Sequence, residues 1–262
     1  MNWTLPAITF LATAWTATAV CAPVGGMSQA KSSDPLCLAQ VEELRSQNIV
    51  AAARAIGRLG ERGACAVDAL RAILRHDPSV HGEAAVVALG DIGPTALSAA
   101  PDLMDAAFVP RLARQALEAL SRLGPGVIVY ILPWLDEPHD QFAFQDNSGF
   151  AAVVFGRVGA PAIPALLQAI NVPSRRLGAV DALGAIGRDA ATAVPTLIEL
   201  YDENADRLLR YGIMKALRDI GPSARDAIPL LERMATAPDI LSDDLLKRTA
   251  QEALAKIRAL QQ

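Results

Sequence analysis

The chain has 262 residues, of which 52% are hydrophobic and only 5% aromatic, so its core must be built from small aliphatic side chains. Its formal net charge of −4 at pH 7 argues against nucleic-acid binding, which normally needs a basic surface. Most of its cationic residues are arginines, which favour ion pairs of fixed geometry between neighbouring elements.

The first 30 residues contain no charged side chain and include an apolar run over residues 5–22. Small residues would permit cleavage after Ala19 or Ala30, so we expect a signal peptide over 1–30 and a folded domain over 31–262. This predicts a periplasmic or secreted bacterial protein. Two alternatives stay open: membrane anchoring through residues 5–22, and lipid attachment at Cys21. Membrane contact is expected only if the segment is uncleaved or lipidated.

The cysteines are consistent with export. Removal of a signal peptide that includes Cys21 would leave the pair Cys37 and Cys65. We expect Cys37 near the start of a helix over 35–46, and Cys65 near the start of a parallel helix over 63–75. Both thiols then lie at one end of the array, where a disulfide can form if their Cα atoms come within about 7 Å. Two buried thiols are the alternative.

One helical pattern recurs seven times along the rest of the chain. Alanine is followed by apolar residues four and seven positions later, and usually by a closing glycine. The closing glycines are Gly60, Gly93, Gly124, Gly159, Gly187 and Gly221. A period near 30 residues is typical of a solenoid, in which each unit buries its apolar face against the next. Each closing glycine suits the left-handed residue that ends a helix.

Each unit is predicted to contain two helices. The second should open with a proline, which loses no hydrogen bond in a first turn. These prolines are Pro101, Pro133, Pro164, Pro195 and Pro229. Inside the first helix a further glycine recurs, at Gly57, Gly90, Gly156 and Gly184. Such a glycine costs about 1 kcal/mol relative to alanine, so we expect close approach of a neighbouring helix there. Arg58, Asp91 and Arg122 occupy equivalent positions and predict an ion-pair ladder.

Segments 88–101, 182–195 and 216–229 each run from an Ala-Leu pair through a closing glycine to a proline. They resemble HEAT repeats, of the bacterial subtype also found in bilin-lyase-like proteins, and the resemblance covers about residues 36–262. It implies an all-α fold, a right-handed α-solenoid of about six helix pairs with capping helices. It also implies a scaffold that binds other proteins, with the second helices lining a concave surface.

The most irregular stretch, residues 134–150, gathers aromatic rings beside acidic residues in a chain that has few rings. We expect it to bind a partner through Trp134, Asp136, Phe142 and Phe144. The alternative is that the rings fill a gap between imperfectly stacked repeats. Acidic residues along the second helices, among them Asp102, Asp105 and Glu199, would favour a basic peptide or protein as partner.

No catalytic motif occurs in the sequence. The nearest approach to a metal site is His76, His81 and Glu83, which fit a helix end and a turn better than a ligand set. We therefore expect no metal and no cofactor. The sequence predicts a non-enzymatic protein-interaction scaffold of the bacterial cell envelope or periplasm that binds no nucleic acid. The alternatives are a metal-assisted enzyme, a regulatory subunit of an envelope enzyme complex, and a purely structural envelope protein.

Overall fold

The computed structural model describes residues 34–46, 48–77, 81–136, 147–202, 206–236 and 244–259. All of them belong to one compact unit, Lys31–Gln262. Every regular element in the described residues is a helix, so the predicted all-α fold is confirmed. The expected signal peptide over residues 1–30 and the predicted site residues Phe142 and Phe144 lie outside the described residues.

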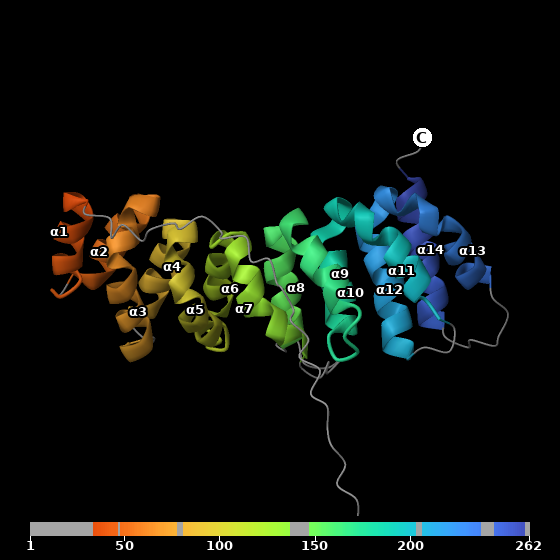
Figure 1. Ribbon diagram of the computed structural model, residues 1–262, viewed down its shortest axis with the longest axis horizontal. Coiled ribbons are helices and arrows are strands. Elements are labelled where there is room, and N and C mark those ends of the chain that lie inside the picture. Colours follow the sequence, from red (N-terminus) through yellow and green to blue (C-terminus); the bar gives the residue numbers. More distant parts are fainter. Residues whose placement is uncertain are drawn as a thin grey trace, which may run out of the picture. The chain divides into compact units, whose positions relative to one another are not determined.

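Six helix pairs follow one another through the described part of the chain, with a capping helix at each end (Figure 1). The first helices of the pairs are α2 (Ile49–Arg58), α4 (Gly82–Ile92), α6 (Ala113–Arg122), α8 (Asn147–Val158), α10 (Arg176–Ile186) and α12 (Arg207–Ile220). The second helices are α3 (Val67–His76), α5 (Ala100–Ala107), α7 (Ile128–Ile131), α9 (Ile163–Ala169), α11 (Val194–Leu200) and α13 (Ile228–Thr236). The caps are α1 (Pro35–Glu43) and α14 (Asp244–Arg258). The arrangement is an α-solenoid of helix pairs, as predicted.

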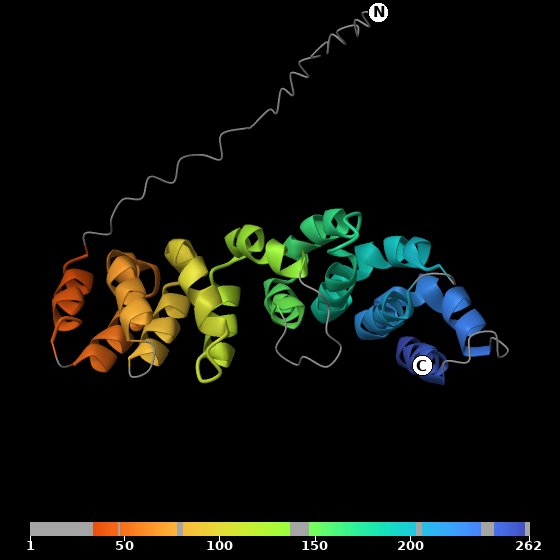
Figure 2. The same cartoon turned by 90° about the horizontal axis from the view of Figure 1, so that it is seen from below.

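The helices form two layers. In the first-helix layer α2 packs on α4, α4 on α6, and so on through α8, α10 and α12 to α14. The second-helix layer consists of α3, α5, α7, α9, α11 and α13, and its members pack against the first helices of their own or the following pair. Figure 2 shows the same succession of pairs after a turn of 90°. Each layer therefore has one packed face and one face that is open to other molecules.

The core comes from the recurring helical pattern. The central apolar residue of each first helix is fully buried: Ile56, Leu89, Leu120, Phe155, Leu183 and Leu217. Alanines fill most of the remaining positions, such as Ala116 and Ala179, which are also fully buried. Small side chains let helices pack closely, and this explains why the chain needs so few aromatic residues.

Both sets of glycines have the predicted roles. The six closing glycines have φ between 56° and 76°, the left-handed region where a helix ends. The interior glycines mark close helix approach. A Cβ atom on Gly90 would lie 2.8 Å from the Cα of Ala119, and one on Gly184 would lie 3.0 Å from the Cα of Ala216. The missing side chain is thus a requirement of the packing between neighbouring first helices.

The third pair departs from the expected pattern. The other prolines lie at the start of α5, α9, α11 and α13, as predicted. Pro133, by contrast, follows the short helix α7 and lies inside the 3-10 helix η4 (Leu132–Asp136), so the prediction that it opens the second helix is wrong. Proline has no N–H to donate to the carbonyl of Val129, and its ring collides with that carbonyl. The α-helix therefore stops, and the chain continues as a tighter helix.

One stretch, Gly82–Ala107, is long and apolar enough to cross a membrane, and two bent helix pairs, 113–136 and 149–169, pass the same test of composition. In Gly82–Ala107, 56% of the most apolar window is buried inside the fold. The stretch comprises α4, the 3-10 helix η2 (Gly93–Ala99) and α5, which pack against α2, α3 and α6. Its apolar composition thus serves the packing between repeats.

Candidate protein-interaction surfaces

The predicted site residue Trp134 lies in an aromatic cluster between three helix pairs. Its ring is 5.7 Å from that of Phe108, at the end of α5, and 6.2 Å from that of Phe150, in α8. Trp134 and Phe150 are each only 7% exposed, whereas Phe108 is 50% exposed. The rings join elements of consecutive pairs, which favours the gap-filling alternative for Trp134. Sequence reasoning missed Phe108, the ring of this cluster that solvent reaches.

The second predicted site residue, Asp136, is held by the chain itself. It accepts hydrogen bonds from Nε and Nη2 of Arg175 at 2.8 and 2.5 Å, and from the Ser174 hydroxyl at 2.8 Å. These hydrogen bonds, that from Arg175 first, hold the pKa of Asp136 below its usual value. Asp136 thus fastens η4 to the turn before α10. A partner-binding role for Trp134 and Asp136 stays a prediction.

The N-terminal cap is attached to the first pair at two points. Cys37 in α1 and Cys65 in the 3-10 helix η1 (Gly60–Ala66) are joined by a disulfide, with their Cα atoms 6.3 Å apart. Asp34, the N-cap residue of α1, accepts a 2.6 Å hydrogen bond from Nε of Arg62 in η1. This bond is the main cause of a lowered pKa at Asp34. The pair of contacts secures a short helix that has a neighbour on one side only.

The weak metal candidates do not converge. His81 Nδ1 lies 2.6 Å from an Asp77 oxygen, and Glu83 accepts a 3.1 Å hydrogen bond from Gln115 of α6. His76 is the last residue of α3. Across the residues that the structure describes, no three His, Cys, Asp or Glu side chains come together as a metal site would require. The 76–83 segment therefore offers turn and inter-helix contacts.

Asp102 of α5 forms a buried ion cluster that the sequence did not reveal. It accepts a 2.6 Å hydrogen bond from Nε of Arg71 and two more from Arg75, both on α3. Its burial acts to raise the pKa, but the hydrogen bonds and charges of Arg75 and Arg71 outweigh that effect, so the pKa of Asp102 lies below its usual value. This carboxylate is thus neutralised within the second-helix layer and adds little to an acidic face.

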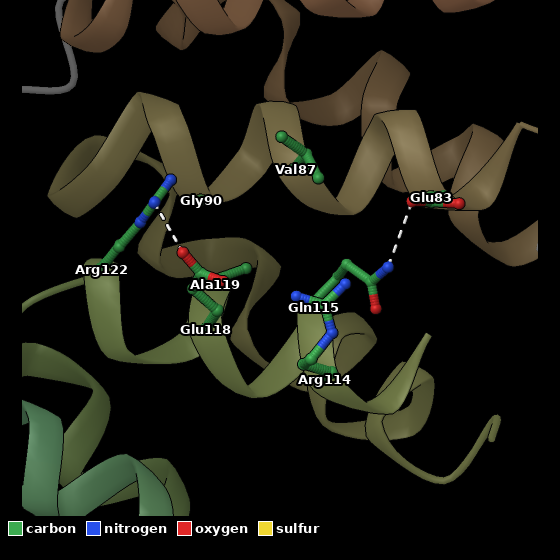
Figure 3. Close-up of a pocket in the computed structure, with 8 residues that line it drawn as sticks. All are labelled: Glu83, Val87, Gly90, Arg114, Gln115, Glu118, Ala119 and Arg122. Carbon is green, nitrogen blue, oxygen red and sulfur yellow. Dashed lines mark hydrogen bonds and ion pairs between the residues drawn. The ribbon is translucent and has the colours of Figure 1, made fainter. Parts of the chain in front are cut away.

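A groove of about 270 Å³ lies between α4 and α6 on the open side of the first-helix layer (Figure 3). Its lining consists of Glu83, Val87, Gly90, Arg114, Gln115, Glu118, Ala119 and Arg122. Val87, which is 39% exposed, and the two small residues form an apolar floor. The polar residues surround it, and several of them bridge the two helices.

Two polar bridges close the ends of this groove. Gln115 donates to Glu83 at one end. At the other, Arg122 donates to Asp91 of α4 at 2.5 Å and to Glu118 of its own helix at 2.7 Å. The predicted ladder is therefore half formed, because no ion pair between Arg58 and Asp91 occurs among the described residues. Asp91 turns its carboxylate toward Arg122 instead.

The chain was compared with known proteins. Residues 163–255, which contain α9 to α14, match the sequence model of the HEAT repeats family. Among solved structures, the crystal structure of an engineered protein is 18% identical over 85% of this chain and 68% of its own, with a TM-score of 0.38. No curated protein matches the chain. HEAT repeats generally mediate protein–protein interactions. Residues 163–255 are thus similar in sequence to HEAT repeats, and the described pairs that precede them follow the same two-helix plan.

Proposed function

We propose that the protein is a non-enzymatic scaffold that binds another protein or a peptide in the periplasm or outside a bacterial cell. The observation that carries this proposal is the α4–α6 groove, which combines an apolar floor with a rim of arginine and carboxylate side chains. Protein interfaces have this composition, with an apolar centre, a polar rim and abundant arginine. The similarity of residues 163–255 to HEAT repeats supports the same function.

The proposed location is supported by two features. The first 30 residues are uncharged and contain an apolar run. The Cys37–Cys65 disulfide would persist in an oxidising compartment but not in a reducing cytoplasm. A metal-assisted reaction gains no comparable support, because His81 and Glu83 contact Asp77 and Gln115 respectively.

Site-specific photo-crosslinking in the native host tests the scaffold. A photoreactive residue would replace Val87 in the groove, Val129 on α7, which is 69% exposed, or Arg188 in the 3-10 helix η6 (Gly187–Ala193). We expect one discrete crosslinked protein at Val87 or Val129 that also binds when both components are purified. Equally diffuse crosslinking at all three positions would contradict a scaffold. Recovery of the protein from the cytoplasm alone would contradict export.

A further inference from the structure

The charged residues are unevenly divided between the two layers. The first-helix layer, α2 to α14 in even numbers, holds 14 lysines and arginines against 7 acidic residues, a net charge of +7. The second-helix layer together with η4 holds 3 arginines against 6 acidic residues, a net charge of −3. The chain as a whole is acidic, at −4. Its positive charge is therefore concentrated on one side of the array.

Four arginines of the first-helix layer are exposed and available. They are Arg54 and Arg58 of α2, Arg114 of α6 and Arg157 of α8. None of the four takes part in an ion pair with another described residue. The carboxylates nearby already have donors, since Arg122 serves Asp91 and Glu118, and Gln115 serves Glu83. The unsatisfied charge of this surface is thus positive.

The repeat register places these arginines around the groove. Arg54 of α2 and Val87 of α4 occupy equivalent positions, 33 residues apart like their closing glycines, Gly60 and Gly93. Contacts such as that of Gln115 with Glu83 confirm that equivalent positions face each other in neighbouring first helices. Arg114 lines the α6 side directly, as Figure 3 shows. The apolar floor therefore has an available guanidinium on each side.

We propose that this surface, the arginine face of α2, α4, α6 and α8, binds an acidic peptide segment of the partner protein. One aliphatic side chain of the segment enters the groove over Val87, Gly90 and Ala119. Carboxylates on either side of it pair with Arg54 and Arg114, because guanidinium groups bind carboxylates in a bidentate geometry. The proposal rests on the scaffold function proposed above and names the partner's chemistry.

An acidic peptide fits this surface better than a nucleic acid does. Glu83, Asp91 and Glu118 lie among the arginines and would repel the phosphates of a backbone that carries a charge at every nucleotide. A peptide can place its carboxylates at intervals that reach the arginines and avoid the acids. The aliphatic floor also has no aromatic ring on which a base could stack.

Fluorescence anisotropy with the full chain tests the proposal. The probe is a labelled peptide of repeated Glu-Glu-Leu-Glu-Glu units, compared with Lys-Lys-Leu-Lys-Lys and Glu-Glu-Ser-Glu-Glu peptides and with a single-stranded oligonucleotide of equal charge. We expect the first peptide to bind most tightly. Arg54→Glu/Arg114→Glu should weaken its binding by about tenfold or more. Val87→Ser should remove the preference for leucine over serine in the peptide.

The matched control is Arg188→Glu/Arg225→Glu, which makes the same charge change at exposed arginines in η6 and in the 3-10 helix η7 (Gly221–Ala227). It should weaken binding less than about twofold. Equal weakening by both double variants, tighter binding of the oligonucleotide, or no binding of the acidic peptide by the parent would each overturn the proposal. If the crosslinked natural partner binds Arg54→Glu/Arg114→Glu as tightly as the parent, the scaffold function stands and the arginine face is wrong.

Discussion

Gly90 of α4 lies so close to Ala119 of α6 that a Cβ atom on Gly90 would come within 2.8 Å of the Ala119 Cα. Gly90→Ala must therefore push two helix backbones apart. We expect it to lower the free energy of unfolding by about 1–3 kcal/mol, even though alanine favours a helix by about 1 kcal/mol. Urea denaturation followed by circular dichroism measures the change.

Gly57→Ala is the matched control for this substitution. Its new Cβ would first meet a carboxylate oxygen of Asp91 at 3.0 Å, and a side chain can rotate away where a backbone cannot. The loss should therefore be less than half of that for Gly90→Ala. Equal losses at the two positions would mean that helix contact is not what requires a glycine at Gly90.

Asp102 joins α3 to α5 through Arg71 and Arg75. Asp102→Asn keeps the size of the side chain but leaves both guanidinium groups without a charged acceptor. We expect a loss of about 1–3 kcal/mol in the free energy of unfolding at pH 7. Glu232→Gln is a suitable comparison, because its ion pair with Arg258 is half exposed on both sides and should contribute under about 1 kcal/mol.

The contribution of Asp102 should depend on pH in a defined direction. Its pKa is lowered in the folded protein, so its stabilising effect is fully present above the unfolded value of about 3.9. The effect is lost as the pH falls through the lower folded value. The difference between the parent and Asp102→Asn should therefore shrink below about pH 4. Chemical denaturation at pH 7, 4 and 3 checks this, and a constant difference would contradict it.

The Cys37–Cys65 disulfide closes a loop between residues 28 positions apart. The variant Cys37→Ser/Cys65→Ser should lose about 2–4 kcal/mol, because its unfolded chain is less restricted. In a repeat array the loss should be local, so amide hydrogen exchange should accelerate in α1 and η1 but not in α10 or α12. Reductant should have the same effect on the parent and none on the variant. Uniform acceleration along the array would contradict a local role.

Trp134 and Phe108 contact each other but differ in burial. Trp134→Ala should cost about 3–5 kcal/mol because it opens a cavity between pairs. Phe108→Ala removes a half-exposed ring and should cost about 1 kcal/mol. Thermal unfolding of both variants provides the comparison. A small loss for Trp134→Ala would revive its predicted role as a partner-binding residue, which a surface side chain could fill without contributing to stability.

Much of the fold could be predicted because its determinants are local. The spacing from Leu89 to Gly93, repeated along the chain, fixes where each first helix packs and ends. Pro133 shows the limit of such reasoning, because its position after the glycine matched the pattern although its distance from α7 did not permit an α-helical start. The candidate site was predicted less well. Trp134 is buried, and the α4–α6 groove was not foreseen.

The sequence by itself determined the helix pairs, the caps and the glycines at helix ends and contacts, since each follows from a period within one or two turns. Only the tertiary structure decided which charges meet. Asp102 pairs with arginines 27 and 31 residues away, and Asp136 with Arg175 across 39 residues. Such pairs depend on side-chain rotamers and on the spacing of neighbouring helices, which no local pattern specifies. For the same reason, the available arginines around Val87 became visible only after the carboxylates had found their partners.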